Sequence, residues 1–210
     1  MTAFCQHSAW GAFLRAGQRI QGRFRPGASG VRLLSDTVVA VARRRQRRPS
    51  AQAAPEQRRY TIDASVFVNA FNPHEEGHTE SLAALTAIQE RGIPVIVPAL
   101  LLPEIVAAVA RASDDGEGAL SYANATARLP HLTLVAQTPT MAKQAAELAA
   151  AHRLRGADSI YVAVARRYGT ALVSRDDEQR SRGAAVVACL TPKDAVGDQV
   201  GSHAPKRPRR

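Results

Sequence analysis

Four acidic side chains stand at or beside places where the sequence predicts buried strands and apolar helices. They are Asp63 at the end of 59–63 (RYTID), Glu104 within 99–113 (ALLLPEIVAAVARAS), Asp158 at the start of a helix over 157–165 (ADSIYVAVA), and Asp176 just after 170–174 (TALVS). A carboxylate among apolar neighbours is costly unless a positive charge compensates it. Two carboxylates about 4 Å apart repel by roughly 4 kcal/mol at an effective dielectric of about 20, so gathering four of them requires divalent cations.

Carboxylate oxygens are the ligands that hard cations prefer, so the expected metal is Mg²⁺ or Mn²⁺. Such a site bridges a phosphate and lowers the pKa of a bound water for in-line attack, so no separate His or Lys base is required. The four acids are therefore predicted to be both the metal ligands and the catalytic residues of a phosphate-hydrolysing site. Three neighbouring side chains are candidates for supporting roles, namely Ser65, Ser174 and Asp177.

Each candidate also has an ordinary structural interpretation. Asp158 is well placed to cap a helix N-terminus, where a carboxylate accepts backbone N–H bonds. Asp176 and the two serines are typical turn residues. Glu104 is harder to explain in this way, because an unpaired carboxylate on so apolar a helix is rare. The four positions taken together favour one metal site over four separate explanations.

Short apolar runs alternate with helical patterns along most of the chain. Five apolar or β-branched runs predict strands, at 59–63, 93–98, 131–136, 170–174 and 184–190. Helical spacing of apolar residues predicts helices at 77–92, 99–113, 116–129, 138–154 and 156–169. This alternation is typical of an α/β fold in which helices cover both faces of a parallel sheet. In such sheets ligands bind at the carboxyl ends of the strands, where Asp63 and Asp176 fall.

The net charge of +10 is concentrated at the two ends of the chain. Residues 1–59 hold 12 arginines and only two acids, and the last five residues are KRPRR, whereas residues 60–205 hold 12 basic and 16 acidic residues. A basic total usually indicates nucleic acid binding, but here that hint attaches to the flanks. The expected organisation is a basic, disordered extension over 1–58, a folded domain over 59–197 and a basic tail over 198–210.

The N-terminal extension has several interpretations. The segment is rich in Arg and poor in acids, as transit peptides are. The same composition is also typical of a disordered extension, or it could result from a start codon placed too far upstream. Its arginines between 43 and 48 are either a solvated charge run, which we favour, or contacts to phosphates. Two cysteines are too few for a disulfide framework and indicate a reducing, cytoplasmic setting. No stretch reaches the roughly 18 apolar residues of a membrane span.

Three segments together resemble a PIN domain and, within that superfamily, the VapC-type toxin ribonucleases. They are YTIDASVFVNAFNP (60–73), VPALLLPEIVAAV (97–109) and GADSIYVAVARRYGTALVSRDDE (156–178). The last is the most specific, because an Asp opens an apolar, Tyr-containing helix that is followed by a strand and then by Ser-x-Asp. The resemblance covers about residues 59–195. It implies a compact, three-layer α/β/α sandwich and a Mg²⁺ or Mn²⁺ site that cleaves RNA.

The acidic positions of that family fall on Asp63, Glu104, Asp158 and Asp176. Asp177 adjoins the fourth position, and the Ser-x-Asp spacing favours Asp176. The resemblance further implies the endoribonuclease toxin of a type II toxin–antitoxin pair, with RNA as substrate, an antitoxin protein as partner and a homodimer. The long basic N-terminus and the KRPRR tail depart from a family whose toxins are little more than the domain itself. The alternatives are therefore a PIN-fold RNA- or protein-binding module and a housekeeping RNA-processing nuclease.

Three rival interpretations explain fewer of these residues. The sequence HEEGH at 74–78 matches the zinc-protease pattern H-E-x-x-H, but Pro73 and Gly77 predict a loop that leads into a helix. It would also leave Asp63, Asp158 and Asp176 unexplained. A haloacid-dehalogenase-type phosphatase needs a second Asp where Ser65 stands. A receiver domain needs a Lys on a late strand, and 170–174 and 184–190 have none.

Overall fold

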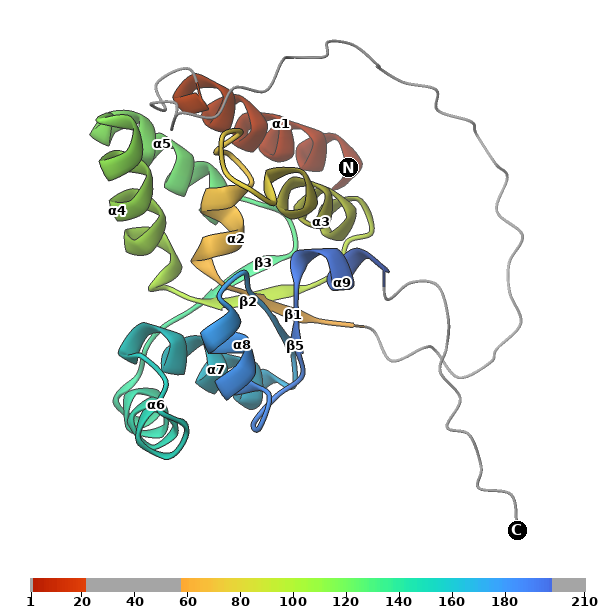
Figure 1. The fold of residues 1–210 in the computed structure, drawn as a ribbon. Helices are drawn as coiled ribbons and strands as arrows, with labels where there is room; N and C mark the ends of the chain where they lie inside the picture. The colour runs from red at the N-terminus through yellow and green to blue at the C-terminus, as the bar shows by residue number, and fades with distance from the viewer. Residues whose placement is uncertain (1, 22–57, 198–210) are drawn as a thin grey trace, which may run out of the picture.

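Five short strands form one sheet in the computed structural model, which describes residues 2–21 and 58–197 (Figure 1). The strands are β1 (Tyr60–Ile62), β2 (Val95–Pro98), β3 (Leu132–Val135), β4 (Ala171–Val173) and β5 (Cys189–Leu190). Their order in the sheet is β3-β2-β1-β4-β5, and every pairing is parallel. The chain adds β2 and β3 on one side of β1 and then returns to add β4 and β5 on the other. The strand order therefore reverses between β1 and β4.

Helices cover both faces of this sheet, which confirms the predicted α/β/α architecture (Figure 1). On one face lie α1 (Thr2–Gln21), α2 (Ala64–Asn69), α3 (His78–Glu90), α4 (Leu101–Ser113), α5 (Gly116–Ala127) and α9 (Pro192–Gly197). On the other lie α6 (Pro139–His152), α7 (Gly156–Tyr168) and α8 (Asp177–Gly183). The central strand β1 is buried along its whole length. Its one polar residue, Thr61, is tolerated there because its hydroxyl donates to the Ile96 carbonyl at 2.8 Å.

One predicted strand is shorter in the structure, and the structure also defines where Pro103 lies in its helix. The strand predicted over 184–190 is limited to Cys189–Leu190, because residues 184–187 form a turn whose Val186 N–H donates to the carbonyl of Gly183 at 2.8 Å. Pro103 lies in the first turn of α4, where the missing N–H of proline costs nothing. Among the described residues, no helix has both the length and the apolar character needed to span a bilayer.

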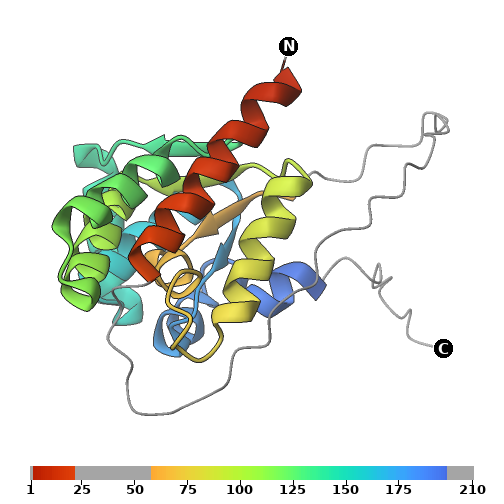
Figure 2. The same ribbon diagram turned by 90° about the horizontal axis from the view of Figure 1, so that it is seen from above.

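Helix α1 contradicts the prediction that residues 1–58 are wholly disordered. Residues 2–21 are helical, and Phe13 is 0% exposed in the core. Figure 2 shows α1 lying across the helical layer beside α5 and α3. The prediction failed because the many arginines of the segment masked the apolar side chains of Trp10, Phe13 and Leu14, which follow helical spacing. Residues 22–57 and 198–210, with the arginine run and the basic tail, lie outside the described residues.

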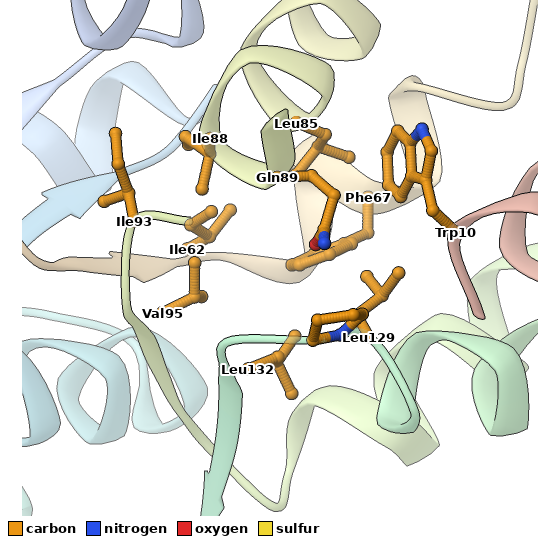
Figure 3. A pocket seen from close by; sticks show the side chains of 11 residues that line it. Trp10, Ile62, Phe67, Leu85, Ile88, Gln89, Ile93, Val95, Leu129 and Leu132 are labelled. Atoms are coloured by element: carbon orange, nitrogen blue, oxygen red, sulfur yellow. The ribbon is translucent and has the colours of Figure 1, made fainter. Parts of the chain in front are cut away.

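Aromatic rings join α1 to the rest of the core. The ring of Phe13 lies 4.9 Å from that of Trp10, 4.7 Å from Phe71 and 5.3 Å from Tyr122. The Tyr122 hydroxyl donates to the Phe67 carbonyl at 3.0 Å, so the buried phenol is satisfied. Beside this cluster Trp10 also lines a small apolar pocket, together with side chains of β1, β2 and α3 (Figure 3). None of the four predicted site acids lines that pocket.

Candidate active site

The site lies at the carboxyl ends of the two central strands. In the register of β1 and β4, Ile62 stands opposite Val173, so Asp63 and Ser174 leave the sheet side by side. The Asp63 N–H donates to the Val173 carbonyl at 2.9 Å and fixes this junction. The strand order reverses between β1 and β4, and in open α/β sheets that reversal opens a crevice for ligands.

Asp63 is the most enclosed of the four acids, with 8% of its surface exposed. It is the N-cap of α2, and its Oδ2 accepts from the Ser65 backbone N–H at 2.9 Å. Its Oδ1 accepts from Nε2 of Gln179 at 3.4 Å. Burial raises the pKa of Asp63, and the nearby charge of Asp176 adds to this, while bonds from Ser65 and Gln179 oppose it.

Asp176 is the N-cap of α8. Its Oδ1 accepts from the Gln179 backbone N–H at 3.0 Å, and its Oδ2 lies 3.3 Å from the Arg155 guanidinium. Its own N–H donates to Oγ of Ser174 at 3.0 Å, so that buried serine orients the start of the helix. The side chain of Asp177 is 93% exposed and pairs with Arg180. Of the two neighbouring acids, Asp176 is therefore the one held against the site.

Glu104 reaches the site from the first turn of α4. Its Oε2 accepts a hydrogen bond from the Tyr161 hydroxyl at 2.6 Å. Burial raises the pKa of Glu104, the bond from Tyr161 lowers it, and the charges of Asp63 and Asp158 raise it further. The sequence suggested no partner for Glu104, and the structure shows that the Tyr161 hydroxyl of α7 is its hydrogen-bond donor.

Asp158 stands in the first turn of α7, whose N-cap is Arg155. The structure therefore places it inside the helix rather than at the cap position. Burial raises the pKa of Asp158 to about 6, and the charges of Asp63 and Asp176 also raise it, whereas Arg155 lowers it. A carboxyl with such a pKa exchanges its proton near neutral pH.

These mutual effects indicate that the four acids lie near enough for their charges to interact, although they come from four separate elements. Asp158 interacts with Asp63 and Asp176, and Glu104 interacts with Asp63 and Asp158. Their oxygens are a donor set that suits Mg²⁺ or Mn²⁺, and a divalent cation would relieve the repulsion that raises their pKa values. Within residues 2–21 and 58–197, no three acidic, His or Cys side chains already stand in a metal-holding arrangement.

The sequence did not reveal the roles of three side chains here: Tyr161 and Gln179 contact the site acids, and Glu178 pairs with Arg155 beside Asp176. Tyr161 lies three residues after Asp158 and so shares its helix face, which was a usable signal. Gln179 is the third residue of α8 after the capping Asp176. This pattern predicts a hydrogen bond to the backbone of the cap residue, not the contact that Gln179 makes with Asp63. Glu178 pairs with Arg155 at 2.8 Å. The contacts to Asp63 and Glu104 cross 116 and 57 positions of the chain, so local patterns do not reveal them.

The HEEGH segment does not form the helix that a zinc protease requires. Its first histidine lies in a turn, and α3 begins only at His78, after Gly77 in the left-handed conformation at φ 78°. Nδ1 of His78 lies 3.0 Å from the Asn69 carbonyl. Glu75 lies 3.9 Å from Arg175, which precedes Asp176, so this loop packs at the rim of the acidic site.

Three solved structures are similar to this chain at low sequence identity. The structure of PAE2754 from Pyrobaculum aerophilum is 14% identical, with 68% of this chain and 96% of that chain covered at a TM-score of 0.49. A chain of VapBC2 from Rickettsia felis, bound to a DNA fragment from their promoter, is 14% identical, with 63% and 98% covered at 0.49. A chain of FitAB bound to an IR36 DNA fragment is 17% identical, with 69% and 99% covered at 0.51. Only the FitAB chain exceeds a TM-score of 0.5, and at 17% identity it shows a shared fold alone.

A search of curated proteins found no match. The PIN domain family, in contrast, matches residues 60–184, which is more than half of the chain and includes all four acids. The match begins at β1 and ends just after α8, so it spans the elements that position the site. The chain therefore belongs to the PIN domain family.

Proposed function

We propose that this protein is an endoribonuclease that uses Mg²⁺ or Mn²⁺ to hydrolyse phosphodiester bonds in RNA. The observation that carries the proposal is the grouping of four acidic side chains around the carboxyl ends of β1 and β4, where burial and neighbouring carboxylates raise the pKa of Asp63, Glu104 and Asp158. PIN domains are generally nucleases and generally use divalent metals, which supports the same conclusion. The proposed metal ligands and catalytic residues are Asp63, Glu104, Asp158 and Asp176.

A bound divalent cation would lower the pKa of the attacking water and offset charge on the phosphate. The chain itself holds the ligand oxygens in place. The backbone N–H of Ser65 fixes one oxygen of Asp63, and the Ser174 hydroxyl fixes the start of α8 beside Asp176. Asp177 faces solvent, so we give it no part in holding the metal.

The acids repel the negative backbone of RNA, and arginines at the rim of the site supply the attraction for it. Arg155 has 65% of its side chain exposed and stands beside Asp176 and Glu178. Arg175 reaches from the other side toward Glu75. Guanidinium groups bind phosphates through paired N–H donors, so we propose that these two side chains guide RNA past the acids. We expect hydrolysis to leave a 5′-phosphate and a 3′-hydroxyl.

We further propose that the protein is the toxin of a type II toxin–antitoxin pair, acting in the cytoplasm as a homodimer with an antitoxin as partner. The resemblance of its three acidic segments to VapC-type toxins supports this role. One structural neighbour is FitAB bound to an IR36 DNA fragment. A housekeeping RNA-processing nuclease or a PIN-fold binding module would have the same fold without the toxin role.

Replacing either of two central acids tests the nuclease. We expect Asp63→Asn and Asp158→Asn to lower the rate of RNA cleavage by more than about 100-fold, because even outer-shell partners of a metal contribute ~10–100-fold. The measurement is cleavage of a labelled RNA with Mg²⁺ or Mn²⁺, and EDTA should abolish it. Asp177→Asn is the matched control and should cleave like wild type. Metal-dependent cleavage that persists in both site variants would refute the assignment.

Growth on induced expression separates the toxin from the other roles. Arrest by wild type and none by Asp63→Asn would support a toxic nuclease. Cleavage of RNA in vitro without arrest would favour the housekeeping nuclease. Binding of RNA without cleavage in any metal would favour the binding module.

A further inference from the structure

Gln179 is fully buried between two of the proposed metal ligands. Its side chain is 0% exposed, although glutamine is a residue that usually faces water. Its Nε2 donates to Oδ1 of Asp63 at 3.4 Å, and its backbone N–H donates to Oδ1 of Asp176 at 3.0 Å. One residue therefore contacts carboxylates that belong to β1 and β4 and holds them relative to each other.

Helix capping does not require this placement of the side chain. An acid at the N-cap followed three residues later by Gln resembles a capping box, in which the Gln side chain returns to the backbone N–H of the cap residue. Here the N–H of Asp176 already donates to Oγ of Ser174 at 3.0 Å. The Gln179 side chain is thereby free of the cap, and it turns toward Asp63.

Packing does not account for the glutamine either. Its Oε1 is buried and has no hydrogen-bond partner among the described residues. A buried acceptor without a partner destabilises the fold, whereas an apolar side chain of similar length would avoid that cost. The glutamine is thus unfavourable for stability at this position, and its contact with Asp63 is the feature that an apolar side chain could not supply.

We propose that Gln179 is a positioning residue that holds Oδ1 of Asp63 toward Asp176 so that both carboxylates serve one divalent cation. This inference rests on the proposed metal-dependent function. The amide donates to a carboxylate oxygen, and outer-shell donors of this kind orient metal ligands. Because α8 carries both the amide and the cap made by Asp176, a shift of this helix would displace the two ligands together.

The test compares Gln179→Met in the full chain with wild type, using Mn²⁺ alone as the probe. Isothermal titration calorimetry gives the Mn²⁺ affinity, and thermal unfolding in EDTA gives the stability of the metal-free protein. We expect Gln179→Met to lower the affinity by about 10–100-fold. We expect its unfolding temperature to equal or exceed that of wild type, because the unpartnered oxygen is removed. Gln179→Leu serves the same purpose if the methionine variant fails to fold.

Gln89→Met is the matched control, because Gln89 lines the apolar pocket beside Ile62 rather than the acidic site (Figure 3). It should leave the Mn²⁺ affinity unchanged. A Gln179→Met protein that binds Mn²⁺ as wild type does would overturn the inference, whatever its stability. Asp63→Asn separates the two proposals. If wild type binds Mn²⁺ and Asp63→Asn does not, the metal site is supported, and the Gln179→Met result then tests only the positioning role of Gln179. If wild type itself binds no Mn²⁺, the metal-dependent function fails and this inference fails with it.

Discussion

Burial and mutual repulsion act together on the site acids, and Asp158 shows the combination most clearly. Its pKa is raised to about 6, first by burial and then by Asp63 and Asp176. The Arg155 guanidinium opposes this shift but is itself shared with Asp176 and Glu178. A single arginine therefore offsets only part of the charge, which leaves the metal-free site strained when its acids ionise.

This repulsion predicts a pH-dependent gain in stability for Asp158→Asn. The folded-state pKa of about 6 exceeds the ordinary value of 3.8, so between these values the folded protein binds more protons than the unfolded chain. The stability of the metal-free protein should fall as pH rises through this window. Asp158→Asn lacks this loss, so its advantage in unfolding temperature over wild type should be small near about pH 4 and largest near about pH 7.

The measurement is thermal unfolding in EDTA across that pH range. Glu147→Gln provides the control, because Glu147 is exposed on α6, a helix that carries none of the four site acids. Its difference from wild type should stay constant with pH. An advantage of Asp158→Asn that shrinks as pH rises would contradict the assigned repulsion.

Among the helices, α1 is tied to the site through α2. Asp63 caps the start of α2, and Phe71 follows its end and packs against Phe13 of α1. Gly17 makes the close approach possible, since a Cβ at that position would overlap the ring of Phe71. The position of α2, and with it the backbone after Asp63, therefore depends in part on how closely α1 docks.

Two glycines of the same helix give opposite expectations for substitution by alanine. Gly17→Ala should lower the free energy of unfolding by about 1–3 kcal/mol, because overpacking against Phe71 outweighs the better helix propensity of alanine. Gly11→Ala should instead raise it by up to about 1 kcal/mol, because a Cβ there meets only the flexible end of Arg15. Chemical denaturation measures both. Equal effects at the two positions would show that α1 does not dock as described.

For the molecule as a whole, the basic N-terminal region and the folded core overlap. The basic charge is concentrated before residue 60 and after residue 205, whereas the core extends back to α1. Phe13 and Ala16 are buried in the same cluster as Phe71 and Tyr122. Removing the basic extension would therefore also remove part of the core and expose aromatic rings.

Deletion of residues 1–57 should accordingly lower the unfolding temperature and promote aggregation. Loss of a buried Phe alone costs about 3–5 kcal/mol, out of a typical total of about 5–15 kcal/mol for a domain. Deletion of 198–210 is the control, because it removes basic charge without any described core residue. Thermal unfolding and size-exclusion chromatography measure the outcome. A 1–57 deletion as stable as wild type would mean that α1 contributes nothing to the core.

Much of the fold could be predicted because its signals are local. The runs at 59–63, 93–98, 131–136 and 170–174 became strands, and the helical patterns between them became helices that cover both faces. The sequence placed Asp63 and Asp176 at the carboxyl edge of the sheet, but only the strand order of the folded sheet brings β1 beside β4. The roles of the four acids as metal ligands remain predictions.

Other features depend on partners that only the tertiary structure brings together. The apolar side chains of α1 pack against Phe71 and Tyr122, which are distant in the sequence, and an Arg-rich composition gives no sign of that contact. Tyr161 could be placed on a helix face, but not against Glu104. Gln179 fits a capping pattern, yet its side chain binds Asp63 because Ser174 already occupies the cap. Local spacing determines which elements form, whereas long-range packing decides which side chains meet, since the energy of a buried contact depends on both of its partners.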